Sequence, residues 1–314
     1  MKAMVITAFG GPEVFEERDI PKPEPGIGQV LVKVHATSVN PIDYMVRRAG
    51  AWAGIRPPAV IGYDVSGVVE AVGSGVRSFK PGNEVYYTSE ISAQGTYAEY
   101  HVAEEKIVAH KPSNLTHIEA ASVPLAGSTA FEALVARADL RMGESVLIHA
   151  GAGGVGSIAI QLARALGASV FATCGVYNME LVKHLGADRV IDYRENDFAD
   201  VVLRETGMSG VDVVLDTVGG ETLSKSVKAA KRFGRIVSIA ASKSDLSAAQ
   251  GKNITIHFMS MQRDRLKLDA LRALIERGRV RPVIDSVMPL KDVALAHRRL
   301  EKGGVKGKIV LQVV

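Results

Sequence analysis

Four glycines within six residues form the pattern in this sequence with the clearest chemical consequence. They are Gly151, Gly153, Gly154 and Gly156, in the run Gly151-Ala-Gly-Gly-Val-Gly156, which matches G-x-G-x-x-G. An apolar run at 145–150 precedes them, and a helical pattern at 155–166 and a second apolar run follow. In such a strand-turn-helix unit the first N–H groups of the helix, Val155 included, point at a phosphate, and the helix dipole stabilises its charge. The sequence therefore predicts a dinucleotide-binding turn.

Each motif glycine has an expected role in this turn. Gly151 permits a tight turn, Gly153 lets the pyrophosphate approach the backbone, and Gly156 lets the helix pack closely on the strand. An ordinary glycine-rich connection in an α/β domain is the alternative interpretation. The flanking strand and helix favour the nucleotide, which the motif alone would not do.

The end of the second strand indicates which nicotinamide nucleotide fits. An Asp or Glu there would bind the ribose 2′-hydroxyl of NAD. Here the strand runs through Thr173 and Cys174, and no carboxylate follows before Glu180. The missing acid removes a repulsion against a 2′-phosphate, so NADPH is favoured over NADH. The expected cation is missing as well, and the nearest candidates to meet the phosphate are Asn178, Lys183, Tyr193 and Arg194.

Two patterns of strands and helices predict two domains, as does a length of 314 residues. Residues 1–118 carry short strand-forming runs between Gly/Pro turns, which predicts a mostly β domain. From residue 119, apolar runs alternate with helical lengths, which predicts a doubly wound α/β domain with a parallel sheet covered on both faces. Its strands are expected at 145–150, 169–173, 189–192, 211–216 and 235–240. Helices at 266–277 and 292–300 and a strand at 308–313 are expected after it.

Composition and charge exclude several classes of protein. The 38 Lys and Arg residues are scattered among 34 Asp and Glu residues, which argues against a nucleic-acid interface. No apolar run approaches the ~18 residues of a membrane span and no secretory leader is visible, so a cytoplasmic protein is expected. The single cysteine, Cys174, excludes an intrachain disulfide.

Seven groups of residues, in order along the whole sequence, carry a family resemblance. They are 39–43, 62–67 with 72–75, 123–130, 150–156, 185–188 with 191–194, 216–220 and 306–311. Together they resemble the medium-chain dehydrogenase/reductases, in particular the zinc-independent quinone oxidoreductase branch related to zeta-crystallin. The resemblance implies a GroES-like catalytic domain, residues 1–118 and 259–314, interrupted by a Rossmann NADP(H)-binding domain, residues 119–258.

The same resemblance leads us to expect no metal. Two positions that hold catalytic zinc ligands in zinc-dependent relatives are occupied by Asn40 and Tyr63, neither a usual zinc ligand. One cysteine cannot form a four-cysteine structural zinc site, and the eight histidines show no ligand spacing. Histidines in the predicted strands, such as His149, are interpreted as packed or surface residues.

The resemblance places Asn40 and Tyr44 in an active-site cleft between the domains. Tyr63 and Trp52 are expected to set its shape. Without a Lewis acid the acceptor must already be electrophilic, and the protein orients it and polarises its carbonyl oxygen. Tyr44 is the expected donor to the developing enolate, with solvent as an equal alternative. Ordinary packing is an alternative role for Tyr44 and Trp52, and Asp43 is a candidate helix N-cap.

Further residues are expected around the cofactor by resemblance. Thr129 is expected near the nicotinamide phosphate, with a helix-start role as the alternative. Val218 and Ala240, at the ends of their strands, are expected along the nicotinamide. Phe258 and Lys308 are expected to contact the cofactor from late in the sequence. A solvated charge on a strand is the alternative for Lys308. The residues expected around the adenosine are Thr173, Cys174, Asn178 and Tyr193, where Cys174 is a lining residue rather than a nucleophile.

The leading hypothesis is an NADPH-dependent reductase of quinones or α,β-unsaturated carbonyls that transfers hydride without a metal. An enoyl-thioester reductase of the same family and a cofactor-binding, crystallin-like protein without turnover are the alternatives. The expected partner is a small electrophilic molecule, and neither nucleic acid nor a membrane. The family implies a homodimer, and the strand at 235–240 is a candidate for the sheet edge that pairs with the partner subunit.

Overall fold

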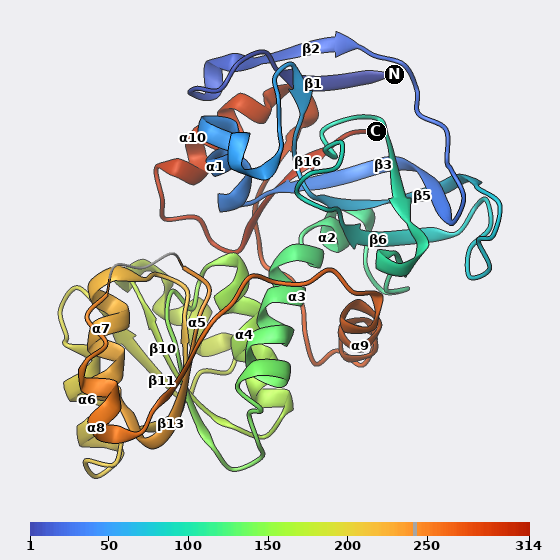
Figure 1. The fold of residues 1–314 in the computed structure, drawn as a ribbon. Helices are drawn as coiled ribbons and strands as arrows, with labels where there is room; N and C mark the ends of the chain where they lie inside the picture. The colour runs from blue at the N-terminus through green and yellow to red at the C-terminus, as the bar shows by residue number, and fades with distance from the viewer. Residues whose placement is uncertain (241–243) are drawn as a thin grey trace. The chain divides into compact units, whose positions relative to one another are not determined.

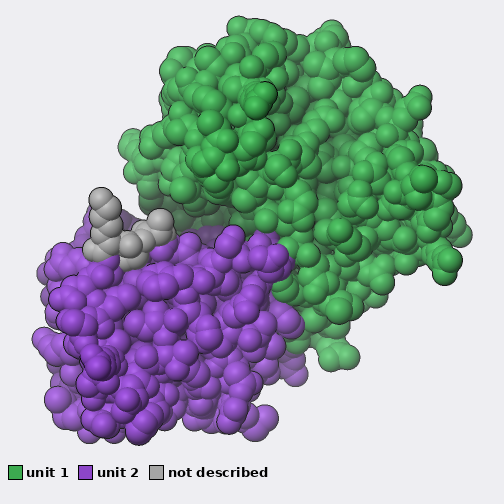
Figure 2. Space-filling model, viewed as in Figure 1, with its two compact units in different colours: residues 1–128, 263–278, 282–314 green, residues 129–262, 279–281 purple. Residues whose placement is uncertain are grey.

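The computed structural model of the protein describes residues 1–240 and 244–314 (Figure 1). The chain divides into two compact units (Figure 2). Unit 1 comprises residues 1–128, 263–278 and 282–314, and unit 2 comprises residues 129–262 and 279–281. In the described part of the chain, no helix combines the length and the apolar character that crossing a membrane requires.

Unit 1 is built on a seven-stranded sheet with strand order β15-β16-β3-β5-β6-β8, in which β7 also pairs with β3. Its strands are β3 (Gln29–Val39), β5 (Asp64–Val72), β6 (Glu84–Thr88), β7 (Tyr100–Glu104), β8 (Ala109–His110), β15 (Ile284–Pro289) and β16 (Lys308–Gln312). β3 alternates between its two faces, and Val30, Val32 and Val34 are buried. The mostly β, GroES-like unit predicted from the sequence is confirmed.

The last strand returns to the first part of the chain. β16 pairs antiparallel with β3, with Ile309 opposite Val39 and Leu311 opposite Thr37. Residues 308–311 are all buried, because β16 lies inside the sheet between β15 and β3. Unit 1 therefore requires residues from both ends of the sequence.

A second, three-stranded sheet with order β2-β1-β4 completes the strands of unit 1. Its strands are β1 (Lys2–Ile6), β2 (Phe15–Asp19) and β4 (Ala59–Val60). The helices of unit 1 are α1 (Pro41–Ala49), α2 (His117–Ala121), α9 (Arg265–Glu276) and α10 (Val293–Glu301), with short 3₁₀ turns at Pro12–Val14, Gly50–Ala53, Glu105–Ile107 and Leu290–Asp292. One buried apolar cluster joins β1, β3, α1, α10 and β16 through residues such as Ile6, Val46 and Ala296.

The start of α1 positions several side chains discussed below. Asn40 is the N-cap residue and Pro41 follows at the first helical position, where a missing N–H costs nothing. Asp43 lies at the third helical position, and its carboxylate accepts the backbone N–H of Asn40 at 2.8 Å. The expectation that Asp43 is itself the N-cap is wrong, because Asn40 occupies that position.

Unit 2 contains a six-stranded, all-parallel sheet with order β11-β10-β9-β12-β13-β14. Its strands are β9 (Ser145–Ile148), β10 (Ser169–Cys174), β11 (Arg189–Asp192), β12 (Val211–Asp216), β13 (Ala230–Ser238) and β14 (Thr255–Phe258). The predicted doubly wound Rossmann sheet is confirmed. The strand order reverses at β9, since β10 lies on one side and β12 on the other, and ligands of such sheets bind at this switch point.

Helices cover both faces of this sheet. α6 (Phe198–Glu205), α7 (Gly220–Ala229) and α8 (Ala248–Lys252) lie together on one face, and α4 (Gly154–Ala165) lies on the other (Figure 1). The remaining helical segments are α3 (Pro124–Phe131), the π-helical turn η4 (Glu132–Arg137), the 3₁₀ turn η5 (Val176–Asn178) and α5 (Met179–His184). Because both faces are covered, the central strands β9 and β12 are buried on both faces and mostly apolar rather than alternating.

The sheet edge differs from the one expected. β13, which includes most of the strand predicted at 235–240, lies between β12 and β14 and is not at the edge. β11 is the opposite edge, and the edge strand on this side of the sheet is β14, where Phe258 is exposed. This short strand was missed because its four residues carry too weak a pattern to be distinguished from a loop.

Candidate cofactor and active sites

The predicted dinucleotide turn joins β9 to α4. Ala150 takes a left-handed conformation with φ of 50°, and Gly153 donates its N–H to the Ala150 carbonyl at 2.9 Å. Gly151 donates its N–H to the carbonyl of Thr173 at 2.8 Å, which fixes the turn to the neighbouring strand β10. Helix α4 begins at Gly154, so the N–H groups of its first turn, including that of Val155, have no partner within the helix.

Two of the motif glycines, Gly156 and Gly151, have different reasons to lack a side chain. A Cβ at Gly156 would lie 2.3 Å from the carbonyl oxygen of Ala150, so the close packing expected there is present. A Cβ at Gly151 would lie 3.1 Å from Ala172 and Ile160 side-chain atoms, which is a tight contact. The tight turn expected at Gly151 depends instead on Ala150, since that residue has the positive φ. The resulting N-terminus of α4 fits a pyrophosphate, because backbone donors and the helix dipole meet without intervening side chains.

A pocket of about 350 Å³ opens in unit 2 at the carboxyl ends of its strands. Three predicted cofactor residues line it: Thr173 from β10, Tyr193 after β11 and Val218 after β12. His149 and Lys225 also line it and were not predicted. The signal for His149 is its place directly after β9, whereas Lys225 comes from α7 and no sequence pattern marks it.

The other predicted cofactor residues lie outside this pocket. Cys174 is buried at the end of β10, and burial raises the pKa of its thiol to about 11, as suits a lining residue. Asn178 is partly buried, and its Oδ1 has no hydrogen-bond partner among the described residues. Thr129 is buried in α3, Ala240 is half-buried after β13, and Phe258 is exposed.

One basic side chain, that of Arg194, lies near Tyr193. The Arg194 guanidinium lies 5.7 Å from the centre of the Tyr193 ring, and both residues are exposed. Lys183 is exposed on α5. The end of β10 itself carries no carboxylate. The nearest one in the sheet is Asp192 of β11, which lies opposite Cys174, is buried and accepts the backbone N–H of Arg194 at 3.1 Å.

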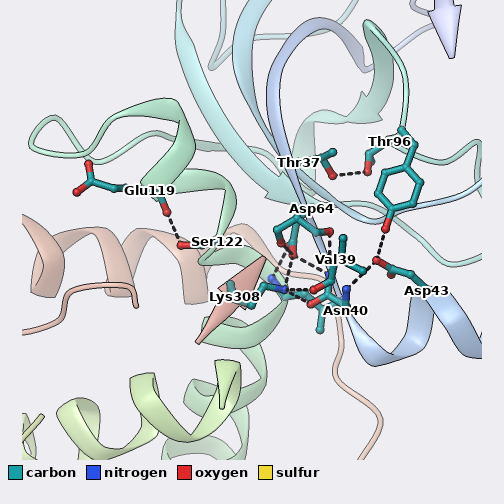
Figure 3. Close-up of polar contacts among 12 residues, drawn as sticks. Thr37, Val39, Asn40, Asp43, Asp64, Thr96, Glu119, Ser122 and Lys308 are labelled. Atoms are coloured by element: carbon teal, nitrogen blue, oxygen red, sulfur yellow. Dashed lines mark hydrogen bonds and ion pairs between the residues drawn. The ribbon is translucent and has the colours of Figure 1, made fainter. Parts of the chain in front are cut away.

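A buried polar cluster in unit 1 surrounds Asn40 (Figure 3). The Lys308 ammonium donates to the side-chain oxygen of Asn40, to the Val39 carbonyl at 3.1 Å and to Asp64 at 3.3 Å. The Asn40 amide donates to the same Asp64 oxygen at 2.8 Å. Asp64 also accepts the Ser38 hydroxyl at 2.6 Å. The amide of Asn40 is therefore held on both sides by a buried ion pair.

Lys308 lies in β16 with its side chain only 6% exposed. The alternative of a solvated strand charge is wrong, because the ammonium is buried against Asp64. The expected cofactor contact of Lys308 stays a prediction. Its three donor positions have partners within unit 1.

Tyr63 is the predicted catalytic residue whose hydroxyl is both buried and without a hydrogen-bond partner among the described residues. Burial, with a smaller contribution from the Asp43 carboxylate, raises the pKa of Tyr63 well above its usual value. Tyr44 is half-buried on α1, with Arg48 5.3 Å from its ring centre, and Trp52 is exposed.

A second hydrogen-bonded chain begins at Asp43. Its Oδ2 accepts the Tyr97 hydroxyl at 2.6 Å, and its Oδ1 has no partner in the described chain. Tyr97 in turn lies 3.2 Å from His297, and His297 lies 2.9 Å from the buried Arg47. Burial raises the pKa of Asp43 to about 7, although the hydrogen bond from Tyr97 opposes the shift.

The described residues offer few side chains that could bind a metal ion together. They contain no group of three or more His, Cys, Asp and Glu side chains arranged to hold an ion. The positions discussed for zinc carry the amide of Asn40 and the phenol of Tyr63, and the amide is already bonded to Lys308 and Asp64.

Comparisons with known proteins agree with this architecture. The family model described as an alcohol dehydrogenase GroES-like domain matches residues 26–113, and the one described as a zinc-binding dehydrogenase matches residues 185–311. Human quinone oxidoreductase is 35% identical over 99% of this chain and 97% of its own length. An Arabidopsis thaliana chloroplastic NADPH-dependent alkenal/one oxidoreductase is 40% identical over 99% of this chain and 79% of its own length.

A solved structure described as an NAD-dependent alcohol dehydrogenase covers 100% of both chains, with a TM-score of 0.94 at 36% identity. Similarity of this extent in sequence and structure shows common family membership. The chain therefore belongs to the medium-chain dehydrogenase/reductase superfamily of nicotinamide-dependent oxidoreductases and is a homologue of the quinone oxidoreductases.

Proposed function

We propose that the protein is an NADPH-dependent reductase of quinones or α,β-unsaturated carbonyls. The observation that carries this proposal is the glycine turn at Gly151–Gly156 beside a pocket at the carboxyl ends of β10, β11 and β12. The names of the relatives, a quinone oxidoreductase and an alkenal/one oxidoreductase, support the acceptor class. When bound, the dihydronicotinamide supplies the hydride.

The preference for NADPH rests on the end of β10. No carboxylate follows Thr173 in the sequence before Glu180, and the neighbouring Asp192 is buried and bonded to the Arg194 N–H. Tyr193 and Arg194 offer exposed donors nearby. We expect the dissociation constant of NADPH to be smaller than that of NADH, measured by quenching or energy transfer of nucleotide fluorescence. A tighter NADH complex would overturn the preference.

We propose that the Tyr63 hydroxyl donates a hydrogen bond to the oxygen of the acceptor. Its raised pKa keeps the phenol neutral at physiological pH, and a neutral buried donor without a protein partner can stabilise a developing negative charge. Asn40 acts differently, because its amide is already bonded to Lys308 and Asp64 and so fixes the shape of this part of unit 1. Tyr44 and solvent are the alternative donors, and the Tyr63→Phe variant distinguishes Tyr63 from both.

The proposed reaction needs no metal ion. Asn40 and Tyr63 replace the usual kinds of zinc ligand, and conjugated acceptors accept hydride without a Lewis acid. About one equivalent of zinc per chain, retained through purification and needed for turnover, would contradict this part of the proposal.

The activity is tested by NADPH oxidation with three acceptors: 9,10-phenanthrenequinone, a small enal and an enoyl thioester. We expect turnover with the first two. Preference for the thioester would indicate an enoyl-thioester reductase. NADPH binding without oxidation by any acceptor would indicate a crystallin-like protein without turnover.

The Tyr63→Phe variant tests the proposed donor. We expect kcat to fall at least about tenfold while the dissociation constant of NADPH stays unchanged, because only the developing charge loses a partner. Tyr87→Phe is the matched control, since the Tyr87 hydroxyl bonds only His101 at 2.9 Å in unit 1. Full activity of Tyr63→Phe would return the role to Tyr44 or solvent.

We also propose that the protein is a homodimer in the cytoplasm. The exposed edge of β14, rather than β13, is the candidate for pairing with the partner subunit, because an unpaired edge can extend a sheet. Light scattering that gives the mass of a single 33.5 kDa chain would exclude the dimer.

A further inference from the structure

His149 occupies the first position after β9, directly before the dinucleotide turn. Its side chain is buried and forms two hydrogen bonds. Nδ1 lies 3.1 Å from the hydroxyl oxygen of Thr173 in β10, and Nε2 lies 2.9 Å from the hydroxyl oxygen of Ser226 in α7. The ring also packs edge-on against Phe198 of α6, with ring centres 4.6 Å apart. One side chain thus links four elements around the pocket.

The direction of each hydrogen bond follows from the donors available. Ser226 donates its hydroxyl hydrogen to the Thr222 carbonyl at 2.7 Å, so its oxygen has to accept from His149. The His149 ring therefore carries its hydrogen on Nε2. Nδ1 is then an acceptor and takes the hydroxyl hydrogen of Thr173.

Thr173 is hydrogen-bonded both to His149 and to the dinucleotide turn. Its hydroxyl oxygen accepts the N–H of Ala150 at 3.3 Å, and its carbonyl accepts the N–H of Gly151 at 2.8 Å. Ala150 is the residue that takes the left-handed conformation, which is unfavourable for a residue with a side chain. The hydrogen bond that Thr173 accepts from Ala150 compensates part of that cost.

We propose that His149, held in its Nε2–H tautomer by Ser226, is a positioning residue that orients the dinucleotide turn through Thr173. This inference rests on the proposed function, because the turn is taken to bind the pyrophosphate of the cofactor. His149 need not touch the reacting atoms for this role. It acts by keeping Thr173 as a donor to Nδ1, so that the Thr173 oxygen stays available to Ala150.

Burial keeps this arrangement intact near neutral pH. It lowers the pKa of His149 to about 4, against a smaller opposing effect of the Asp216 carboxylate. The other charged groups around the pocket are Asp197, Glu221 and Lys225, and the Lys225 ammonium lies 3.3 Å from Glu221. Nδ1 therefore remains an acceptor across the physiological range.

The Ser226→Ala variant tests the proposal from a position outside the pocket. It removes the acceptor that fixes the tautomer, and Ser226 does not line the pocket. We expect NADPH to bind about tenfold more weakly, as for the loss of one buried hydrogen bond, while kcat at saturating NADPH is unchanged. Unchanged NADPH affinity in a folded Ser226→Ala protein would overturn the proposal.

Ser66→Ala provides a matched control in unit 1. Ser66 is also buried and lies 2.8 Å from a histidine nitrogen, Nδ1 of His117, so the same atoms are removed from a similar pair. We expect this variant to lose stability without losing NADPH affinity. An equal loss of affinity in both variants would indicate general destabilisation and contradict the specific role of His149.

A double-mutant cycle separates positioning from direct contact. Thr173→Val keeps the shape of Thr173 and removes its hydroxyl. If His149 acts through that hydroxyl, Ser226→Ala adds little to the loss in NADPH affinity caused by Thr173→Val, and the two changes are not additive. Additive losses would show that Ser226 and Thr173 act independently, which would overturn the proposal.

Nitrogen-15 NMR of labelled histidine gives a readout independent of activity. We expect His149 to be neutral with hydrogen on Nε2 at pH 7, and the Ser226→Ala variant to populate the Nδ1–H form. An Nδ1–H tautomer in the unchanged protein would overturn the inference. Failure of the unchanged protein to bind any nicotinamide nucleotide would instead reject the proposed function, so the two failures are distinguishable.

Discussion

The ion pair between Lys308 and Asp64 places two opposite charges in the interior of unit 1. Both side chains are almost completely buried, and Asn40 lies between them with its amide bonded to each. Removing two charges from water costs several kcal/mol per ion, and good geometry has to compensate that cost. Such a pair contributes little net stability, but it fixes the orientation of Asn40.

Replacing only one partner of this pair should be strongly destabilising. Lys308→Met leaves the Asp64 carboxylate buried without its counter-charge, so we expect a loss of about 3–5 kcal/mol in the free energy of unfolding. Denaturant unfolding measures this loss. The double variant Lys308→Met with Asp64→Asn should recover part of it, and a double variant less stable than either single one would contradict the assignment.

At the scale of elements, the β9–turn–α4 unit depends on one close contact. The carbonyl of Ala150 lies where a Cβ at Gly156 would have to be, and this carbonyl is backbone that cannot rotate away. The first turn of α4 can approach β9 only because Gly156 has no side chain. The position of the N–H groups offered to a phosphate follows from that approach.

Gly156→Ala should therefore weaken cofactor binding. The added methyl group forces the turn and helix apart, and we expect at least a tenfold rise in the dissociation constant of NADPH, or about 1.4 kcal/mol. Gly251→Ala in α8 is the matched control, because an added Cβ there meets nothing within 4 Å. Normal NADPH affinity of a folded Gly156→Ala protein would show that the turn does not hold the pyrophosphate.

The elements of unit 2 were largely predictable because buried parallel strands are apolar along their whole length. β9 to β12 follow the runs seen in the sequence, with ends shifted by two residues at most. β14 could not be recognised, since its four residues are short and partly exposed. The start of α1 was predicted three residues late, with Asp43 as a candidate N-cap, although Asn40-Pro41 with Asp43 is a helix-start signature.

The candidate sites were less predictable than the elements. Thr173, Tyr193 and Val218 were expected, because carboxyl ends of parallel strands meet at one edge of the sheet. The hydrogen bond from His149 to Ser226 spans 77 residues and depends on how α7 packs, which no local pattern encodes. The same holds for Lys308 and Asp64, which are 244 residues apart.

At the scale of the whole molecule, buried histidines make stability depend on pH. Burial lowers the pKa of His101 and of His149 to about 4 and that of His297 to about 3. Their unfolded value is near 6.5, so the unfolded chain binds protons first as pH falls. The stability that depends on neutral histidine is complete above pH 6.5. It is lost as pH falls from 6.5 to about 4 for His101 and His149, and to about 3 for His297.

We expect the free energy of unfolding to fall on acidification from pH 7 to pH 4.5, measured by denaturant unfolding. Asp43 opposes this trend, because its pKa of about 7 in the folded protein is higher than in the unfolded chain. As pH falls from 7 to 4 the folded protein binds this proton first, which stabilises the folded state. In the His101→Gln variant the free energy of unfolding should fall less steeply with pH, since Gln does not titrate. A flat profile in the unchanged protein would contradict the buried neutral state of these histidines.

The position of β16 constrains the order in which the protein can fold during its synthesis. Residues 308–312 leave the ribosome after the whole of unit 2, yet they occupy the sheet place beside β3. Unit 2 can form its own parallel sheet first, whereas residues 36–39 of the earlier-made β3 must wait without the strand that pairs with them. A nascent chain in that state presents an open strand edge to other chains, and this interval is when chaperones would protect it.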